Sequence, residues 1–313
     1  MVLKTMLLKE LVKNGYSEEE NCKVWNIANT SFWFINPEMS KAALRLSEVP
    51  RYKATIIDTE AKLLKENMAN FLKDLGNPMF NLIDINCTDG SKARTIINSL
   101  SKTTKFRYCP ICFNGYFTEL AIKNIKKENF SNIVEYAPRL SQNYESLGEI
   151  GAALRNSTYQ KNVFLLLGSL ISSFEINDYL FKLSQTMFPK DILIIGNGIR
   201  TGERFAHLET YKHPAFNKWF IHLMRILEFK DNEVEVGARF AHNRLEGYYT
   251  IKANRKIQFE GKNIEFKAGD KIIVAFQYKL YEQELRDFCK MYFDSIVLVK
   301  DPQNEYALVL CKK

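Results

Sequence analysis

The stretch NLIDINCTDGSK, residues 81–92, decides the fold class predicted for this chain. Its first six residues are a short apolar run that predicts a buried strand, and residues 91–102 follow with apolar positions at helical spacing. In an open α/β sheet, ligands bind beyond the carboxyl ends of the strands. A loop that opens with Asp84 and continues with small residues suits a nucleoside at that edge. For the loop alone a second interpretation stays open, a structural turn in which Asp89 or Ser91 caps the helix.

Outward from this stretch, strand-like and helix-like segments alternate along the chain. Strands are predicted at residues 106–113, 132–136, 163–167 and 191–195, and helices at residues 116–127 and 175–186. This alternation implies a parallel sheet covered by helices on both faces. Near the end, a helix at 282–292 precedes strands at 294–300 and 306–310, which predicts an antiparallel closing hairpin. The predicted fold class is therefore α/β.

The residues after Arg200 have a different pattern. An aromatic-rich helix is predicted first, and alternating strands follow it, with glycines at the turns. The predicted elements are the helix 215–229 and the strands 248–253, 256–260, 263–266 and 271–278. The pattern indicates an antiparallel module inserted into the α/β domain, and residues 1–13 are predicted to form an amphipathic opening helix.

A second loop supports a ligand site at the edge of the sheet. The apolar strand in VFLLLGSLISSF, residues 163–174, ends in Gly168 and Ser169, which would let a ligand approach the backbone closely. A tight turn is again the alternative. Because the two loops occur in the right order and spacing, together they favour a cofactor site over two unrelated turns.

The composition limits the class of protein. With 46% hydrophobic residues and no uninterrupted run of about 18 apolar residues, the chain is expected to be a soluble globular protein. Six dispersed cysteines are typical of a reduced, cytoplasmic protein. The Cys109–Cys112 C-x-x-C pair lacks a partner pair, so we expect no metal and interpret it as small thiols at a strand end. The net charge of +8 is spread along the chain, which makes a nucleic-acid partner possible but not favoured.

Five segments in order resemble one family. They are WFIN at residues 33–36, VPRY at 49–52 with Thr55 and Glu60 after it, the loop 84–92, YCPI at 108–111 and LGSLISSF at 167–174. With the later Ile195 to Gly198 and Lys279, the chain resembles the histidine-specific N-methyltransferases of ergothioneine biosynthesis and their relatives. These enzymes act on amino acids such as histidine or modified tryptophans. The resemblance implies S-adenosylmethionine as the cofactor and a Rossmann-like class I methyltransferase sheet.

The resemblance also implies a division of labour. Residues 60–199 and 280–313 would form the methyltransferase domain, and residues 1–59 and 200–279 an α+β substrate-binding domain made from the N-terminus and the insert. The predicted cofactor-binding residues are Asp84, Asn86, Cys87, Thr88, Gly90, Lys92, Cys112, Gly168 and Ser169. The predicted substrate-binding residues are Tyr52, Ser173, Tyr211, Gln277 and Tyr278. No single catalytic residue is predicted, since methyl transfer from a sulfonium depends on positioning.

Departures from the family pattern decide the predicted substrate. Cys112 and Gly198 stand where the family has aspartates, Ser173 replaces the asparagine that holds the amino acid, and Ala275 and Gln277 replace the glutamate and serine that contact imidazole. We therefore expect a monomeric methyltransferase that N-methylates an amino acid or related small amine other than histidine. The alternatives are an RNA or protein methyltransferase, and a catalytically silent binding protein with the same fold.

Overall fold

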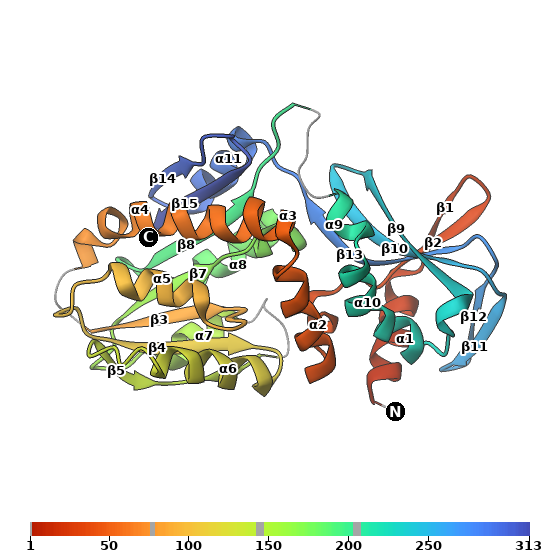
Figure 1. The fold of residues 1–313 in the computed structure, drawn as a ribbon, viewed down its shortest axis with the longest axis horizontal. Helices are drawn as coiled ribbons and strands as arrows, with labels where there is room; N and C mark the ends of the chain where they lie inside the picture. Colours follow the sequence, from red (N-terminus) through yellow and green to blue (C-terminus); the bar gives the residue numbers. More distant parts are fainter. Residues whose placement is uncertain (1, 76–78, 142–146, 203–207) are drawn as a thin grey trace. The chain divides into compact units, whose positions relative to one another are not determined.

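The computed structural model describes residues 2–75, 79–141, 147–202 and 208–313 (Figure 1). The chain forms two compact units. The first comprises Met1–Val49 and His207–Tyr278, and the second comprises Pro50–Ala206 and Lys279–Lys313. The domain limits predicted from the sequence, and the substrate role given to one domain, stay predictions.

The second unit is built on a mixed sheet. Within the described residues its strands run in the order β14-β15-β8-β7-β3-β4-β5, with β6 pairing to β4. The strands are β3 (Phe80–Ile85), β4 (Phe106–Cys112), β5 (Ile133–Tyr136), β6 (Arg139–Leu140), β7 (Lys161–Leu166), β8 (Ile192–Gly198), β14 (Ser295–Lys300) and β15 (Tyr306–Lys312). Strands β3 to β8 pair in parallel, whereas β15 joins β8 and β14 in antiparallel pairs. The predicted α/β class and the antiparallel closing hairpin are confirmed.

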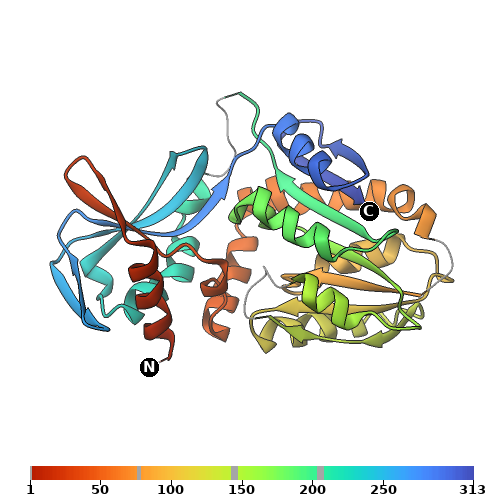
Figure 2. The same cartoon turned by 180° about the vertical axis from the view of Figure 1, so that it is seen from behind.

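Helices cover both faces of this sheet, which explains why its strands read as unbroken apolar runs. On one face lie α4 (Thr59–Phe71), α5 (Ser91–Ser99) and α6 (Gly115–Lys126), and on the other lie α7 (Leu147–Leu154), α8 (Ile176–Thr186) and α11 (Glu282–Tyr292), as Figures 1 and 2 show. Every residue of β3 and β4 is buried. Helix α6 begins where Asn114 accepts a hydrogen bond from the backbone N–H of Phe117.

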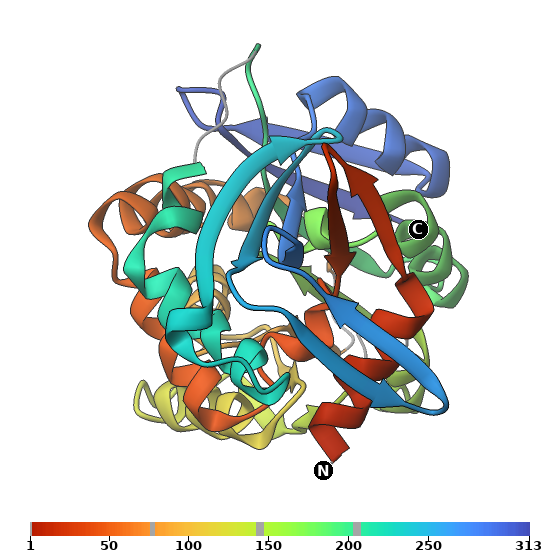
Figure 3. The same ribbon diagram turned by 90° about the vertical axis from the view of Figure 1, so that its right-hand side faces the viewer.

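The first unit holds an antiparallel sheet with one parallel pair. Its described strands run in the order β1-β2-β13-β10-β9, and β11 and β12 form a separate hairpin (Figure 3). The strands are β1 (Tyr16–Glu19), β2 (Cys22–Asn26), β9 (Val234–Ala241), β10 (Arg244–Ile251), β11 (Arg255–Phe259), β12 (Lys262–Phe266) and β13 (Lys271–Tyr278). The helices of this unit are α1 (Val2–Asn14), α2 (Pro37–Ser47), α9 (Leu208–Lys212) and α10 (Pro214–Ile226).

An aromatic cluster fills the core between α2, α10 and the segment before α2. The rings of Phe34 and Trp219 stack with their centroids 5.5 Å apart, and the indole Nε1 of Trp219 donates a hydrogen bond to the carbonyl of Trp33 at 2.6 Å. Helix α2 begins where the Asn36 side chain accepts from the N–H of Met39, with Pro37 at the first helical position. The WFIN segment therefore serves as core and helix cap within the first unit.

Most predicted elements form within a few residues of their expected limits, including the opening helix. The C-x-x-C pair lies on β4 with both thiols fully buried, which confirms the strand-end interpretation. No group of three or more metal-ligating side chains occurs in the described part of the chain. Among the same residues, no helix has both the length and the apolar character needed to span a bilayer.

Candidate functional site

The loop after β3 has the backbone conformation of a ligand-binding turn. Asn86, Thr88 and Gly90 have φ values of 56°, 47° and 79°, in the left-handed region. A β-branched residue is strained there, so Thr88 is held by its surroundings. A side chain at Gly90 would place its Cβ 3.1 Å from the Cα of Ala121, which explains why glycine is required there. The Asp89 carboxylate accepts from the N–H and hydroxyl of Ser91, but the N-cap of α5 is Gly90, so the prediction that Asp89 or Ser91 is the N-cap is wrong.

Asp84 lies at the end of β3 and is almost completely buried. Its exposed fraction is 3%, and the Tyr108 hydroxyl on β4 donates a hydrogen bond to its Oδ2 at 2.7 Å. Burial raises the pKa of Asp84 to about 7, against the lowering effects of the Tyr108 hydrogen bond and the nearby Lys92. This carboxyl group therefore changes charge near neutral pH.

The neighbouring strand end brings two more predicted residues to the same edge. Ile85 pairs with Ile111 of β4 on one side and with Leu166 of β7 on the other, so the loops after these three strands open at one end of the sheet. The Cys112 thiol points to the Asn86 carboxamide, with Sγ and Oδ1 3.9 Å apart. Cys87 is buried, and burial raises its pKa well above the usual thiol value. Its thiol is therefore uncharged, and its predicted place in the cofactor site stays a prediction.

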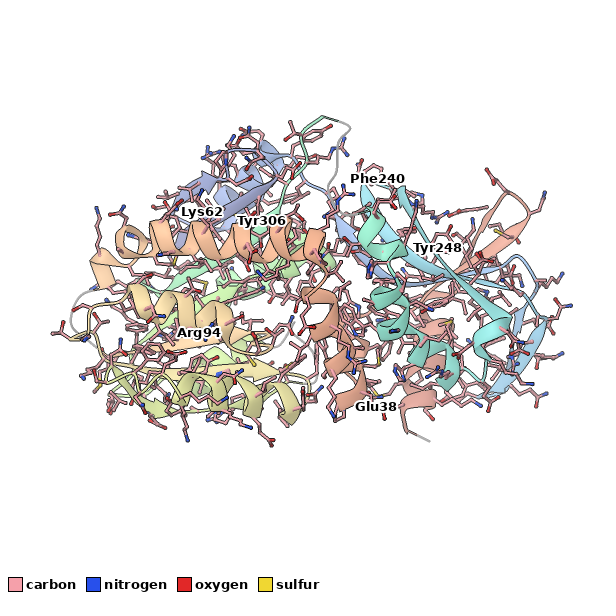
Figure 4. All side chains as sticks on the ribbon, viewed as in Figure 1. Glu38, Lys62, Arg94, Phe240, Tyr248 and Tyr306 are labelled. Carbon is pink, nitrogen blue, oxygen red and sulfur yellow. The ribbon has the colours of Figure 1, made fainter. Side chains whose placement is uncertain are left out.

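A buried carboxylate on α4 joins the two predicted loops. Glu60 is 1% exposed, and its Oε1 accepts a hydrogen bond from the N–H of Gly168 at 2.7 Å and another from the Tyr306 hydroxyl. Its Oε2 lies 3.0 Å from Nζ of Lys92 on α5. Figure 4 shows Tyr306 beside α4. Sequence reasoning noted Glu60 only as part of a motif. The sequence signal that could have identified Glu60 as a buried carboxylate is its position among apolar residues of a helix.

The Gly168–Ser169 turn is shaped by this carboxylate and by β8. Gly168 and Ser169 have φ values of 72° and 60°, both left-handed. The Ser169 hydroxyl accepts from the N–H of Gly198 at 2.8 Å, and the Ser169 N–H donates to the carbonyl of Gly196 at 2.9 Å. Lys92 Nζ occupies the space where a side chain of residue 168 would begin, 2.2 Å from an ideal Cβ. The cofactor-site residues predicted on α5 and after β7 are therefore in contact.

Gly196→Ala should destabilise this region by about 1–3 kcal/mol, the usual effect of overpacking. The added Cβ would lie 2.2 Å from Oε1 of Glu60 and 3.0 Å from the Tyr306 hydroxyl. Urea denaturation measures the change. Gly115→Ala is the matched control, because its Cβ meets nothing closer than the Glu119 carboxylate at 3.5 Å. Equal stability of the two variants would contradict the packing around Glu60.

The predicted substrate residues are divided between the two units. Tyr52 and Ser173 belong to the second unit, and Tyr211, Gln277 and Tyr278 to the first. Tyr52 is half-buried, and burial together with the charge of Glu60 raises its pKa to about 12. Ser173 is 5% exposed, and its hydroxyl has no hydrogen-bond partner among the described residues. An unsatisfied buried hydroxyl is a group that a ligand can complete.

The three substrate candidates of the first unit differ in environment. Tyr211 is buried, and its ring lies 4.9 Å from that of Phe216. Gln277 and Tyr278 are half-buried on β13, and the Tyr278 ring lies 5.5 Å from that of Phe276. The assignment of these residues to substrate and of the loop residues to cofactor stays a prediction.

A charged cluster in the first unit was not predicted. Glu246 on β10 is fully buried, with Nε of Arg239 at 2.8 Å and Nε of Arg244 at 2.7 Å. Arg239 also makes a two-pronged ion pair with Glu19. These four residues border a cavity of about 360 Å³ that also contacts β2 and the end of α1 and contains none of the predicted site residues. Charges adjacent in space on β1, β9 and β10 are far apart in sequence, which hid the cluster.

Comparison with known proteins gives one family. A family model described as histidine-specific, S-adenosylmethionine-dependent methyltransferase matches residues 44–313. No curated protein sequence matches the chain significantly.

Three of the solved structures to which the chain is similar have low sequence identity to it. An S-adenosylmethionine-dependent methyltransferase from Clostridium acetobutylicum is 12% identical, with 87% of this chain and 97% of that chain covered and a TM-score of 0.45. A proposed O-methyltransferase from Nostoc punctiforme is 10% identical, with coverage of 100% and 70% and a TM-score of 0.47. The sugar N-methyltransferase KedS8 from a Streptoalloteichus species is 7% identical, with coverage of 82% and 87% and a TM-score of 0.37.

Proposed function

Since the chain belongs to the family of histidine-specific, S-adenosylmethionine-dependent methyltransferases, we propose that it N-methylates an amino acid or related small amine other than histidine. Its cofactor is S-adenosylmethionine. The observation that carries the proposal is the joint placement of the left-handed loops 86–90 and 168–169, with Asp84 and Lys92, at one end of the parallel sheet. This is the edge at which α/β sheets bind nucleosides.

The residues present at this edge fit the cofactor. Glycine at 90 and 168 keeps side chains out of the turns, and the carboxyl group of Asp84 and the ammonium of Lys92 offer opposite charges to an amino-acid tail. Asn86, Cys87, Thr88, Cys112 and Ser169 complete the proposed cofactor-binding set around them. The cofactor supplies an electrophilic methyl group on a sulfonium.

The protein's own contribution is position and exclusion of water. An amine attacks only in its neutral form, so the site must desolvate it or accept its proton. Holding the two reactants in line is worth about 7–11 kcal/mol in favourable cases. We propose that Tyr52, Ser173, Tyr211, Gln277 and Tyr278 hold the acceptor. The unsatisfied hydroxyl of Ser173 supports its place in this set.

Position 275 argues against histidine as the acceptor. Ala275 is buried on β13 opposite Gly247 of β10, so it offers no side-chain acceptor for an imidazole N–H. An N–H group left without a partner in a closed site costs about 1–3 kcal/mol. A larger or less polar amine side chain is therefore proposed. The net charge of +8 gives RNA or protein acceptors as the second candidate, and a silent binding protein is the third. We further propose a monomer acting in the cytoplasm.

Calorimetric titration with S-adenosylmethionine and S-adenosylhomocysteine tests the proposal. We expect saturable binding of both, followed by S-adenosylhomocysteine formation when a panel of amino acids and amines is added. Binding without turnover on any small amine would favour the silent protein or a macromolecular acceptor, and salt-sensitive RNA binding would identify the RNA version. Failure to bind either nucleoside would overturn the proposed function.

A further inference from the structure

Lys279 is a buried cation without a counter-charge. It follows β13 directly and is 4% exposed. Among the residues that the structure describes, none accepts a hydrogen bond from its Nζ or forms an ion pair with it. Burial alone lowers its pKa to about 8, with no contribution from a neighbouring charge. Burial of the side chain thus disfavours the charged form of the ammonium group.

Several other buried charged groups among the described residues have ion-pair partners, whereas Asp84 is held by the hydrogen bond from the Tyr108 hydroxyl. Glu60 is paired with Lys92, Asp191 with Arg155, and Glu246 with two arginines. Lys279 is therefore a buried lysine with a lowered pKa and no ion pair to a described residue. Such groups cluster at functional sites.

The position of Lys279 relates it to the candidate site of the second unit. Leu280 pairs with Ile199 just beyond β8, and the Arg200 N–H donates to the Leu280 carbonyl at 2.9 Å, which fixes this segment at the carboxyl end of β8. Nζ of Lys279 lies 3.8 Å from the place where a Cβ on Gly198 would stand. The Gly198 N–H in turn donates to the Ser169 hydroxyl.

A second unsatisfied group lies in the loop after β7. The Ser173 hydroxyl is buried and has no described partner, four residues beyond Ser169. An ammonium group and a hydroxyl can each donate a hydrogen bond to an anion, and Lys279 and Ser173 both belong to segments that meet β8 near its carboxyl end.

We propose that Lys279 binds the carboxylate of a ligand in the methyl-transfer site. The inference rests on the proposed function and deepens it, because it makes the acceptor a carboxylate-bearing amine, or else makes Lys279 the anchor of the cofactor's own carboxylate. Both sources have the same chemistry. In either case the ligand carboxylate supplies the counter-charge that no described residue gives to Lys279.

Lys279→Met tests the inference, because methionine keeps the length of the side chain and removes its charge. Without ligand, the thermal midpoint of the variant should rise above that of the wild type, since an uncompensated buried charge is gone. Lys62→Met on α4 is the matched control, because the Lys62 side chain is 65% exposed (Figure 4). Its midpoint should stay within error of the wild type. A lysine with a structural role would instead give a lower midpoint on substitution.

Ligand binding identifies the source of the carboxylate. Calorimetry with S-adenosylhomocysteine tests the cofactor carboxylate. If Lys279→Met binds this nucleoside roughly tenfold or more weakly than the wild type does, Lys279 is assigned to the cofactor carboxylate. The acceptor arm measures thermal stabilisation by tryptophan, tyrosine, arginine and histidine beside tryptamine, tyramine, agmatine and histamine. Lys279 is assigned to the acceptor carboxylate if an amino acid raises the thermal midpoint of the wild type, while the corresponding amine does not and the same amino acid does not stabilise Lys279→Met.

Two results would overturn the inference. In the first, Lys279→Met and the wild type have the same affinity for S-adenosylhomocysteine and are stabilised equally by amino acids. In the second, no amino acid stabilises either protein, and their affinities for S-adenosylhomocysteine are equal. Failure of the inference differs from that of the proposed function, which is read on the wild type alone as an absence of nucleoside binding. Thermal stabilisation by amino acids is also measured without nucleoside, so it tests the inference even if the protein binds no nucleoside.

Discussion

The affinity of the wild-type protein for S-adenosylmethionine should rise about tenfold between pH 6 and pH 8, because a group with a pKa of about 7 goes from roughly one-tenth to nine-tenths ionised over that range. Asp84 is that group. Because the proposed site places Asp84 beside the cationic cofactor, the ionised carboxylate should bind it more tightly than the protonated form does. Calorimetric titrations at half-unit steps of pH measure the slope.

Asp84→Asn is the control for this pH dependence. The amide keeps the shape of the carboxyl group and its hydrogen bond with the Tyr108 hydroxyl, but it does not titrate. Its affinity should be independent of pH across this range and, at pH 8, lower than that of the wild type by roughly tenfold to a hundredfold, the worth of a hydrogen bond to a charged group. If the affinity for S-adenosylmethionine depended on pH equally in the wild type and in Asp84→Asn, the result would contradict the placement of Asp84 in the cofactor site.

The same carboxyl group makes the stability of the ligand-free protein depend on pH in the opposite sense. Its folded pKa is raised, so its stabilising contribution is fully present below the unfolded value of 3.8 and is lost as the pH rises through 7. A shift of about three units corresponds to about 4 kcal/mol over this window. From pH 4 to pH 8, the unfolding free energy of the wild type should therefore fall by about 4 kcal/mol relative to that of Asp84→Asn.

The sequence could predict the sheet because local signals agree with the fold there. The runs around Leu82, Tyr108 and Phe164 are fully buried on both faces, so burial and chain order alone indicate parallel strands. Strand β9 escaped prediction, since VEVGARFA has half-buried residues along most of its length and lacks a clean alternation. The β1–β2 hairpin is four and five residues long and carries charged residues, which gave no apolar pattern to detect.

The candidate site was predictable only in part for a related reason. The loops after β3 and β7 carry glycine and small polar residues in a recognisable order. Glu60 and Lys279, in contrast, were noted in the sequence only as parts of the family resemblance, and their importance comes from what lies beside them in space. Whether such a residue is paired or orphaned is decided by tertiary contacts that a single sequence does not contain.

Glu246→Ala should lower the unfolding free energy of the first unit by about 3–5 kcal/mol, the usual effect of removing one partner from a buried ion pair. The carboxylate is fully buried between the Nε atoms of Arg239 and Arg244, so its removal leaves two guanidinium groups with less compensation. Arg239 keeps its ion pair with Glu19, whereas Nε of Arg244 loses the partner that the described residues give it. Scanning calorimetry reads the loss as a lower midpoint.

Glu235→Ala on the neighbouring strand β9 is the control. It also removes a carboxylate from an ion pair, but from an exposed one, so it distinguishes the effect of burial from the effect of losing a charge. Glu235 also forms an ion pair, with Lys252 at 2.9 Å, but its side chain is 66% exposed. Exposed pairs contribute about 0–1 kcal/mol, so this variant should unfold close to the wild type. Glu246→Gln should fall between the two, because the amide keeps an acceptor for one arginine while the charge is lost. If Glu246→Ala were as stable as Glu235→Ala, the buried Glu246 ion pairs would contribute no more to stability than an exposed pair.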